Sequence, residues 1–241
     1  MRTPQEVADV CQILRQLTRM TSKVRRGIGA SRQDVNVSIA GGTRIEIKGV
    51  PRIPLIPLLV HNEAGRQKAL LDIRDELKQR GISHDTFKAD FYDITEILKN
   101  TLYQPIQNAW TDQFKVSCVR LHKFKGILRH STQPDTNFAK EISDRVRVVA
   151  CLDKIPNIIH SDSDDETIGS TSWTKIRKLS QAAPDDALVI VWGHPRDVAT
   201  AGKEIALRAE EAIDGVPSET RQALPDGNNG FERILPGADR M

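Results

Sequence analysis

The sequence has few of the residues that mark several large protein classes. Its three cysteines lie far apart without a C-x-x-C pair, and an odd number argues against a disulfide framework. The longest apolar run, residues 53–60, is interrupted by two prolines, whereas a membrane-spanning helix needs about 20 apolar residues. The first 25 residues contain acids and arginines in place of the apolar core of a secretory signal. We therefore expect a cytoplasmic protein that does not enter a membrane.

Common catalytic signatures are also missing. There is no G-x-S-x-G nucleophile motif, no G-x-x-x-x-G-K-[ST] phosphate loop and no G-x-G-x-x-G turn. The six histidines show neither H-x-x-x-H nor Cys/His spacing, which argues against a structural zinc site. The acidic run 162–166 lacks the glycine and the final glutamate of a calcium loop, so we interpret it as a solvated turn. Aromatic residues make up only 5% of the chain, and the core must be mainly aliphatic.

What the chain does have is the composition of a soluble globular protein. Its 241 residues are 39% apolar and 28% charged, and this length suits one large or two small domains. The formal net charge of +3 is unevenly distributed, because residues 151–241 hold ten Lys/Arg against sixteen Asp/Glu. The excess of basic residues therefore lies in residues 1–150, and it predicts a surface there that faces a polyanion.

Local patterns in the first third of the chain predict a helix, a hairpin and a second helix. Residues 3–6, Thr-Pro-Gln-Glu, form a capping-box pattern that begins an amphipathic helix ending at Gly27. Two alternating segments, 34–39 and 43–50, are joined by Ala-Gly-Gly and predict a β-hairpin. A long helix is expected over residues 58–80.

Residues 82–111 have the pattern of a connector, and a second unit begins near residue 112. The connector is expected to contain short helices at 93–98 and 103–110. In the second unit, the patterns predict strands at 114–121, 146–152, 158–160 and 187–192, and helices at 171–183 and 197–213. Strands that alternate with helices indicate an α/β or α+β unit, and we assign the whole chain to the α+β class.

The predicted hairpin has the most distinctive chemistry. Carboxylates interleaved with bases can hold a hard metal ion and phosphate groups together, as phosphoryl transfer requires. The alternative is an ordinary solvated sheet face with cross-strand ion pairs, and spacing alone does not separate the two. Because side chains alternate between the faces of a strand, one face must carry the polar residues Arg32, Asp34, Asn36, Ser38, Arg44, Glu46 and Lys48.

Two basic segments are weaker candidates. Residues 25–29, Arg-Arg-Gly-Ile-Gly, can hold a phosphate through backbone N–H groups and two arginines, or they can be a helix end followed by a loop. Arg15, Arg19 and Lys23 are spaced four residues apart on the first helix. They can follow a nucleic-acid backbone, or they can form a solvated face.

The hairpin resembles a signature of the tRNA-dependent amidotransferases. Residues 32–38 (Arg-Gln-Asp-Val-Asn-Val-Ser), the double glycine and residues 43–48 (Thr-Arg-Ile-Glu-Ile-Lys) are similar to the subunits that transamidate misacylated tRNA. These are the bacterial-type B subunit and the archaeal-type E subunit. The resemblance is greater to the archaeal-type E subunit of glutamyl-tRNA(Gln) amidotransferase. It is carried by Arg-Gln-Asp at 32–34, the Gly-Gly turn at 41–42 and Lys-Gly-Val at 48–50. The segments 66–67, 73–77 and 93–97 agree with this resemblance.

The second unit resembles the domain that this subunit shares with bacterial-type aspartyl-tRNA synthetases. The similarity is carried by residues 124–128, 159–162 and 215–221, while residues 225–227 and 235–241 resemble the segment that returns to the catalytic domain. The resemblance implies four parts, which are the C-terminal part of a catalytic cradle (1–81), a connector (82–111), an inserted domain (112–214) and a return segment (215–241).

The resemblance also implies a reaction, its cofactors and its partners. The E subunit uses ATP and Mg²⁺ to phosphorylate the γ-carboxylate of glutamate on tRNA(Gln), and ammonia then displaces phosphate to give Gln-tRNA(Gln). An asparaginase-like D subunit supplies the ammonia, and two such heterodimers can pair as a homodimer. By this resemblance the expected site residues are catalytic Glu46, Asp34 and Lys48, metal-ligating Asp34 and Glu46, and cofactor-binding Arg32, Asn36 and Arg44.

The family's subunit is much longer than 241 residues. We therefore expect this chain to be a fragment that is inert when alone. A non-catalytic module that binds tRNA or a protein partner is the alternative, and so is a bacterial-type B subunit. A fragment of aspartyl-tRNA synthetase would explain only about residues 112–214 and would leave the hairpin unexplained.

Overall fold

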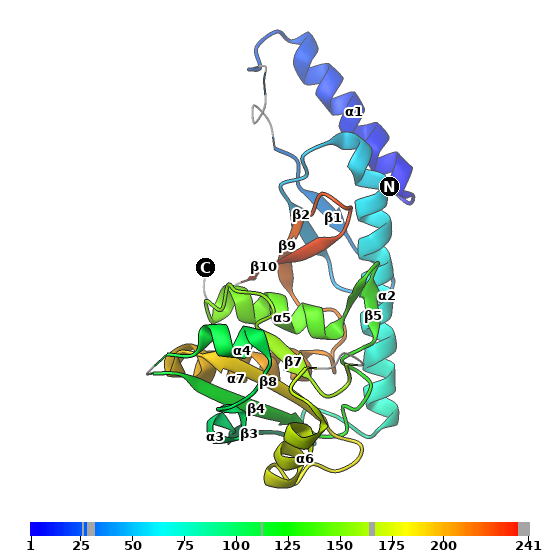
Figure 1. The fold of residues 1–241 in the computed structure, drawn as a ribbon. Coiled ribbons are helices and arrows are strands. Elements are labelled where there is room, and N and C mark those ends of the chain that lie inside the picture. Colours follow the sequence, from blue (N-terminus) through cyan, green and yellow to red (C-terminus); the bar gives the residue numbers. More distant parts are fainter. Residues whose placement is uncertain (26, 28–31, 112, 164–166, 236–241) are drawn as a thin grey trace.

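The computed structural model describes residues 1–25, 27, 32–111, 113–163 and 167–235, and the chain has an α+β fold with two four-stranded sheets (Figure 1). The first sheet has the strand order β1-β2-β9-β10. Its strands come from both ends of the chain and are β1 (Val35–Val37), β2 (Ile45–Lys48), β9 (Glu219–Ala223) and β10 (Asn229–Ile234). The N-terminal part of the chain also contains α1 (Pro4–Met20), the 3₁₀ turn η1 (Ile53–Leu55) and α2 (Ile56–Gln79).

The second sheet has the order β3-β4-β8-β7, and each neighbouring pair of strands is antiparallel. Helices α5 and α7 lie on the side of this sheet that shares a core with α2, and α3, α4 and α6 cover the other side. The elements are β3 (Ala89–Asp93), α3 (Thr95–Leu98), α4 (Gln104–Ala109), β4 (Lys115–Leu121), β5 (Ser131–Gln133), β6 (Thr136–Asn137), α5 (Phe138–Val149), β7 (Ile158–His160), α6 (Ser170–Leu179), β8 (Ala187–Gly193) and α7 (Pro195–Glu211).

The chain leaves the first sheet after β2 and returns to it about 170 residues later. On its return β9 lies parallel to β2, with Glu46 beside Thr220 and Lys48 beside Gln222. β10 then pairs antiparallel with β9 and forms the edge of the sheet. A parallel pair needs a long crossover connection, and here the crossover contains the whole second sheet.

Most of the expected elements are present, but residues 146–152 do not form the expected strand. Their first residues belong to the last turn of α5, whose N-terminal residue is preceded by the cap Asn137. Phe138, Ile142 and Val146 recur every four residues and are fully buried on one helix face. After residue 145, valine alternates with arginine over only a few positions. The four-residue spacing of buried apolar side chains extends along the whole of α5, and this helical pattern decides the structure.

The first helix is also shorter than expected, since it ends at Met20 and not at Gly27. Its beginning is as predicted, with Thr3 and Glu6 forming a reciprocal capping box. At its end the Thr21 hydroxyl donates to the Thr18 carbonyl, a side-chain bond that competes with continued helix. A further strand that the sequence pattern did not predict, β3, lies in the expected connector and forms an edge of the second sheet.

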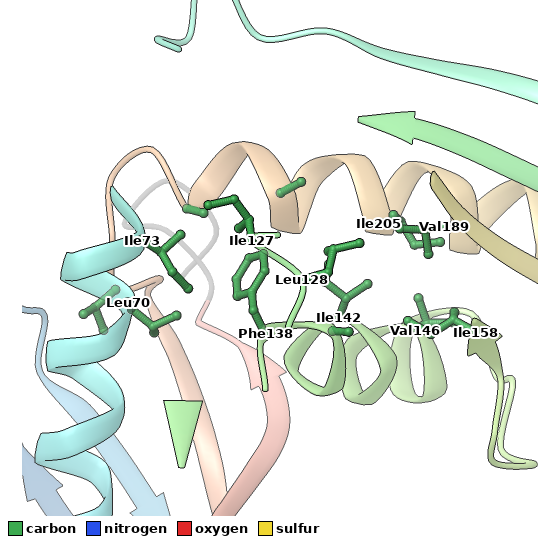
Figure 2. Close-up of a cluster of buried hydrophobic side chains, with 14 of the residues drawn as sticks. Leu70, Ile73, Ile127, Leu128, Phe138, Ile142, Val146, Ile158, Val189 and Ile205 are labelled. Carbon is green, nitrogen blue, oxygen red and sulfur yellow. The ribbon is translucent and has the colours of Figure 1, made fainter. Parts of the chain in front are cut away.

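One continuous core joins the two sheets, and it is mainly aliphatic as the composition predicted. It lies between the long helix α2, helix α5 and helix α7. Figure 2 shows part of this cluster, with the labelled side chains Leu70, Ile73, Ile127, Leu128, Phe138, Ile142, Val146, Ile158, Val189 and Ile205. Because the same apolar cluster includes residues of both sheets, the first sheet is held directly against the second part of the molecule.

The long helix α2 has 24 residues, but its sequence is interspersed with charged and amide side chains. Within the described part of the chain, no helix combines the length and apolarity that a membrane span requires.

Candidate active site

The hairpin has one buried face and one polar face, as its sequence predicts. The two valines of β1 pair with the two isoleucines of β2, and all four side chains are buried. Between these pairs Asn36 stands opposite Glu46 on the other face. Successive side chains of a strand point to opposite faces, so the buried pairs fix the polar residues on the accessible side.

The double glycine of the turn is required by the packing of α2. Gly41 has a φ of +79°, which side-chain-bearing residues rarely adopt. A Cβ at Gly42 would lie 2.6 Å from Oε1 of Gln67. This buried amide accepts a hydrogen bond from the Ile39 N–H at 3.2 Å and donates one to the Val37 carbonyl at 3.1 Å. The turn is therefore closed by a side chain of α2.

Glu46 and Lys48 are brought together on the polar face. Lys48 Nζ lies 3.8 Å from Glu46 Oε2, and both side chains are partly buried. Asp34 is exposed just before β1, and its Oδ1 accepts a hydrogen bond of 3.3 Å from the N–H of Gly49. This bond connects the open ends of the two strands and positions Asp34 at the same end as Lys48.

The side chains of the other predicted hairpin residues are exposed to solvent. Arg32, Asn36 and Arg44 are exposed, and the described residues provide no ion pair to either arginine. Arg15, Arg19 and Lys23 are likewise exposed along α1 and the turn after it. The basic segment 25–29 lies largely outside the described residues, so a phosphate site there stays a prediction.

The polar face continues across β9 and β10. The sequence pattern did not predict that these two strands lie beside the hairpin. Thr220 and Gln222 stand beside Glu46 and Lys48 in the parallel pair. On the far side of β9, a bulge places both Glu232 and Arg233 opposite Thr220.

Thr220 lies in the middle of this face and is fully buried. Its Oγ1 has no hydrogen-bond partner among the described residues, and the same holds for the buried Oε2 of Glu232. Buried polar atoms are almost always hydrogen-bonded, to protein, water or a ligand. These two oxygens therefore mark where the face has unused bonding capacity, and of the two residues Thr220 lies directly beside Glu46.

The opposite face of β9 is occupied by a buried cluster of three carboxylates and three guanidinium groups. We call it the buried ion cluster; its members are Glu63 and Arg66 of α2, Glu141 of α5, Arg208 of α7, and Glu219 and Arg221 of β9. Glu141 is its centre. Both of its oxygens accept hydrogen bonds of 3.1 Å from Arg221, and Oε2 also accepts one of 2.8 Å from Arg66.

The cluster reaches both halves of the first sheet. On one side Arg221 belongs to β9 itself and also contacts Glu219 at 2.6 Å. On the other side Glu63 accepts a bond of 2.9 Å from Gln67, the same amide that holds the β1 turn. A hydrogen-bonded path thus runs from β1 through α2 and α5 to β9.

Burial raises the pKa of the Glu141 carboxyl, but the neighbouring Arg221, Arg66 and Arg208 outweigh burial and lower that pKa to about 2. Burial lowers the pKa of Arg66, and the surrounding carboxylates reverse this and raise it. Glu141 and Arg66 are therefore both charged at neutral pH. A buried charge is tolerated when it is paired and hydrogen-bonded, as these are.

The sequence offered one signal for β9, the run Glu219-Thr220-Arg221, which carries part of the family resemblance. A strand with two buried charged residues does not show the alternation of apolar residues that marks a strand.

The described residues include no group of three or more His, Cys, Asp or Glu side chains placed to hold a metal ion. A magnesium ion held by one or two carboxylates and substrate phosphates needs no such group.

Residues 1–225 match the family of the GatB/GatE catalytic domain. The chain belongs to this family. Among its relatives is the glutamyl-tRNA(Gln) amidotransferase E subunit of Pyrococcus furiosus, which is 42% identical over 239 residues. The proteins of the same name from Saccharolobus solfataricus and Methanocaldococcus jannaschii are 40% and 38% identical over 245 and 243 residues.

These alignments cover 99–100% of this GatB/GatE chain but only 37–38% of the relatives. The chain thus spans somewhat more than a third of the length of the subunits that it matches. The family match includes β1, β2 and β9 together, so the strands that carry Glu46, Lys48 and Thr220 lie inside the matched region, which ends before β10.

Proposed function

We propose that this chain forms part of the catalytic cradle of a glutamyl-tRNA(Gln) amidotransferase subunit, which converts Glu-tRNA(Gln) to Gln-tRNA(Gln). One observation carries the proposal: the hairpin and the returning strand β9 of a GatB/GatE catalytic domain share a polar face with Glu46, Lys48 and Thr220. The names of the relatives support the reaction.

The reaction has two steps. A γ-carboxylate oxygen of the tRNA-bound glutamate attacks the γ-phosphorus of ATP, a new P–O bond forms, and the bond to ADP breaks. Ammonia then attacks the carbonyl carbon, phosphate leaves with the bonding electrons, and the nitrogen loses a proton to give the amide. Phosphorylation is needed because an oxide is a very poor leaving group, and the catalyst must mainly position the reactants and offset charge.

The residues of the hairpin suit these tasks. Lys48, Arg32 and Arg44 would offset the negative charge of the phosphate groups, and the amide of Asn36 would orient the nucleotide or the acyl group. Asp34 and Glu46 provide hard oxygen donors, and Mg²⁺ is usually bound by one or two carboxylates together with substrate phosphates. When bound, Mg²⁺ would neutralise charge on the transferred phosphate. The unpartnered Oγ1 of Thr220 next to Glu46 is in keeping with such a site.

The remaining parts follow from the same proposal. Residues 1–81 and 215–241 would belong to the cradle, 82–111 to a connector, and 112–214 to a domain like the insertion of bacterial-type aspartyl-tRNA synthetases. The partners would be tRNA(Gln) charged with glutamate and an asparaginase-like D subunit that supplies ammonia, in a homodimer of the heterodimer. The three free cysteines suit a cytoplasmic location.

The proposal is tested by Glu46→Ala in the complete subunit together with its ammonia-supplying partner. We expect ATP-dependent formation of Gln-tRNA(Gln) to fall at least a hundredfold, since a positioned charge at the reacting centre is worth about 10²–10³ in rate. Binding of tRNA should stay nearly unchanged. The matched control is Glu96→Ala, an exposed glutamate on α3.

An unchanged rate in Glu46→Ala would overturn the assignment of this face. The second candidate function is a non-catalytic module that binds tRNA or a partner. In the same assay we expect no product from the 241-residue chain alone. Retained tRNA binding by that chain, with an active Glu46→Ala subunit, would favour the second candidate.

A further inference from the structure

The register of the first sheet places four polar side chains in one row across its strands. Asn36 of β1 stands opposite Glu46 of β2, Glu46 lies beside Thr220 of β9, and Thr220 stands opposite Arg233 of β10. Directly paired residues of neighbouring strands project from the same face of a sheet, with the strands about 4.8 Å apart. An amide, a carboxylate, a hydroxyl and a guanidinium group therefore follow one another across all four strands (Figure 1).

Thr220 is the buried member of this row. Its side chain is fully buried, and its Oγ1 has no hydrogen-bond partner among the described residues. Burying an unbonded hydroxyl costs stability, whereas valine has the same shape without that cost. The nitrogens of Arg208 and Oε2 of Glu219 also lack bonds, but they belong to the buried ion cluster, where opposite charges compensate them. The Thr220 hydroxyl therefore indicates a bond to a group that binds on the polar face.

The cations around Thr220 indicate that this group is an anion. Arg233 is exposed, and the described residues provide no ion pair to it. Lys48 lies one row away on the same face, and its ion pair with Glu46 is 3.8 Å long. Two cations and a hydroxyl match the charge and the three oxygens of a terminal phosphate group. A carboxylate has a single charge and two oxygens, and it would use fewer of these donors.

The neighbours of Thr220 can make room for such a group. The Glu46 side chain is 32% exposed, and its long ion pair with Lys48 restrains it only weakly. Changes of side-chain rotamer are common when a binding partner arrives. The bulge at Glu232 interrupts the ladder directly beside Thr220, and bulges of this kind redirect side chains next to active sites.

We propose that Thr220 and Arg233 bind a phosphate group of the nucleotide, an assignment that rests on the proposed function. The Thr220 hydroxyl donates a hydrogen bond to a phosphate oxygen, and the Arg233 guanidinium donates to the same phosphate from the side of β10. Lys48 offsets charge from the neighbouring row. The return of the chain to the first sheet thus completes the nucleotide site that the hairpin begins.

Thr220→Val in the complete subunit, bound to its ammonia-supplying partner, separates binding from a structural role. Its melting temperature should stay the same or rise, because the lost hydroxyl has no partner in the described structure. Its affinity for ATP with Mg²⁺, measured by titration calorimetry without tRNA, should fall about tenfold, since a bond to a charged group is lost. Thr220→Ser keeps the hydroxyl and should retain most of the affinity. Thr200→Val, at an exposed position of α7, is the matched control and should change neither quantity.

Arg233→Ala should weaken ATP binding at least fivefold in the same titration, because the phosphate loses a charged donor. Its control is Arg196→Ala, at an exposed arginine in the first turn of α7. A lower melting temperature with unchanged ATP affinity in Thr220→Val would overturn the proposal and make the hydroxyl structural. Unchanged ATP affinity with a raised KM for Glu-tRNA(Gln) would also overturn it, and would assign the hydroxyl to the γ-carboxylate of the substrate.

Glu46→Ala distinguishes a failure of this proposal from a failure of the proposed function. If the unmodified complex forms Gln-tRNA(Gln), Glu46→Ala does not, and Thr220→Val is normal in ATP binding and rate, then only the roles of Thr220 and Arg233 are wrong. A fully active Glu46→Ala complex would overturn the proposed function and this proposal together.

Discussion

The polar residues on the two faces of β9 lie in different surroundings. Glu219 and Arg221 point into the buried ion cluster, where every carboxylate is within reach of a guanidinium group. Thr220 and Gln222 belong to the other face, beside Glu46 and Lys48 of the hairpin. A single five-residue strand thus connects an ion-paired charged interior with a face that holds the Thr220 hydroxyl. Among the described residues that hydroxyl has no hydrogen-bond partner, and neither do the Arg208 nitrogens or Oε2 of Glu219 on the interior side.

This difference indicates how the candidate site is held in place. Among the described residues the polar face has one ion pair of its own, 3.8 Å long and partly exposed, and such pairs contribute at most about 1 kcal/mol. Its geometry must therefore come from the buried side. There Glu141 of α5 binds Arg221 of β9 and Arg66 of α2, so a residue from outside the first sheet fixes the sheet's register.

The largest effect is expected when the centre of the buried ion cluster loses its charge. Glu141→Gln preserves the size of the side chain but leaves Arg221 and Arg66 without their shared carboxylate. Breaking a buried ion pair from one side typically costs about 3–5 kcal/mol. We expect the free energy of unfolding, measured by urea denaturation, to fall by about this amount.

Glu46→Gln is the matched control, because it makes the same change on the other face of the sheet. Its expected cost is below about 0.5 kcal/mol, in line with a partly exposed ion pair. Equal losses of stability in the two variants would show that the two faces do not differ in the way described.

The pH dependence of stability gives the next largest effect. The Glu141 carboxyl has a pKa of about 2 in the folded protein, against 4.5 for the unperturbed group. A lowered pKa means that its stabilisation is complete above pH 4.5 and is lost as the pH falls toward 2. The linked free energy is on the order of 3 kcal/mol for such a shift.

We therefore expect the unfolding free energy to fall steeply between pH 4.5 and pH 3, and to fall less steeply over this window in Glu141→Gln. The measurement is urea denaturation at several pH values in this range. Identical slopes for the two proteins would show that other carboxyl groups carry the acid sensitivity.

The contrast between the faces also explains what the sequence could predict. The hairpin was recognisable because its buried face is apolar, so that alternation separates Val35 and Ile47 from Asn36 and Glu46. β9 was not recognisable, because its buried face is made of Glu219 and Arg221. The stability of such a strand depends on partners about 80 and 155 residues away in sequence, and no local pattern contains them.

Other differences have the same origin. Residues 146–152 resemble a strand over a few positions, but the buried face of α5 is set by packing against α7 and β10. Apart from α5, the sequence therefore predicted the long elements whose burial is apolar and periodic, and the polar residues of the hairpin. It could not predict that Thr220 lies next to Glu46, since this depends on the long return of the chain to the first sheet.

The smallest of these effects concerns the link between the cluster and the β1 turn. In Gly42→Ala the new Cβ would lie 2.6 Å from Oε1 of Gln67 and 3.3 Å from the Ile39 side chain. Gln67 is fully buried and is held by bonds to Ile39, Val37 and Glu63, so it cannot move aside without breaking one of them. We expect a loss of about 1–3 kcal/mol in urea denaturation.

Gly65→Ala is the control for this substitution. Gly65 lies in the middle of α2 with no atom within 4 Å of the added Cβ, and alanine there should stabilise the helix by about 0.5–1 kcal/mol. If Gly42→Ala costs no stability, the turn is not held by Gln67, and the hairpin would then be positioned by its apolar face alone. If it does cost stability, and amide exchange accelerates in β1 while β9 keeps its protection, then the path from Glu141 to the hairpin runs through this one amide.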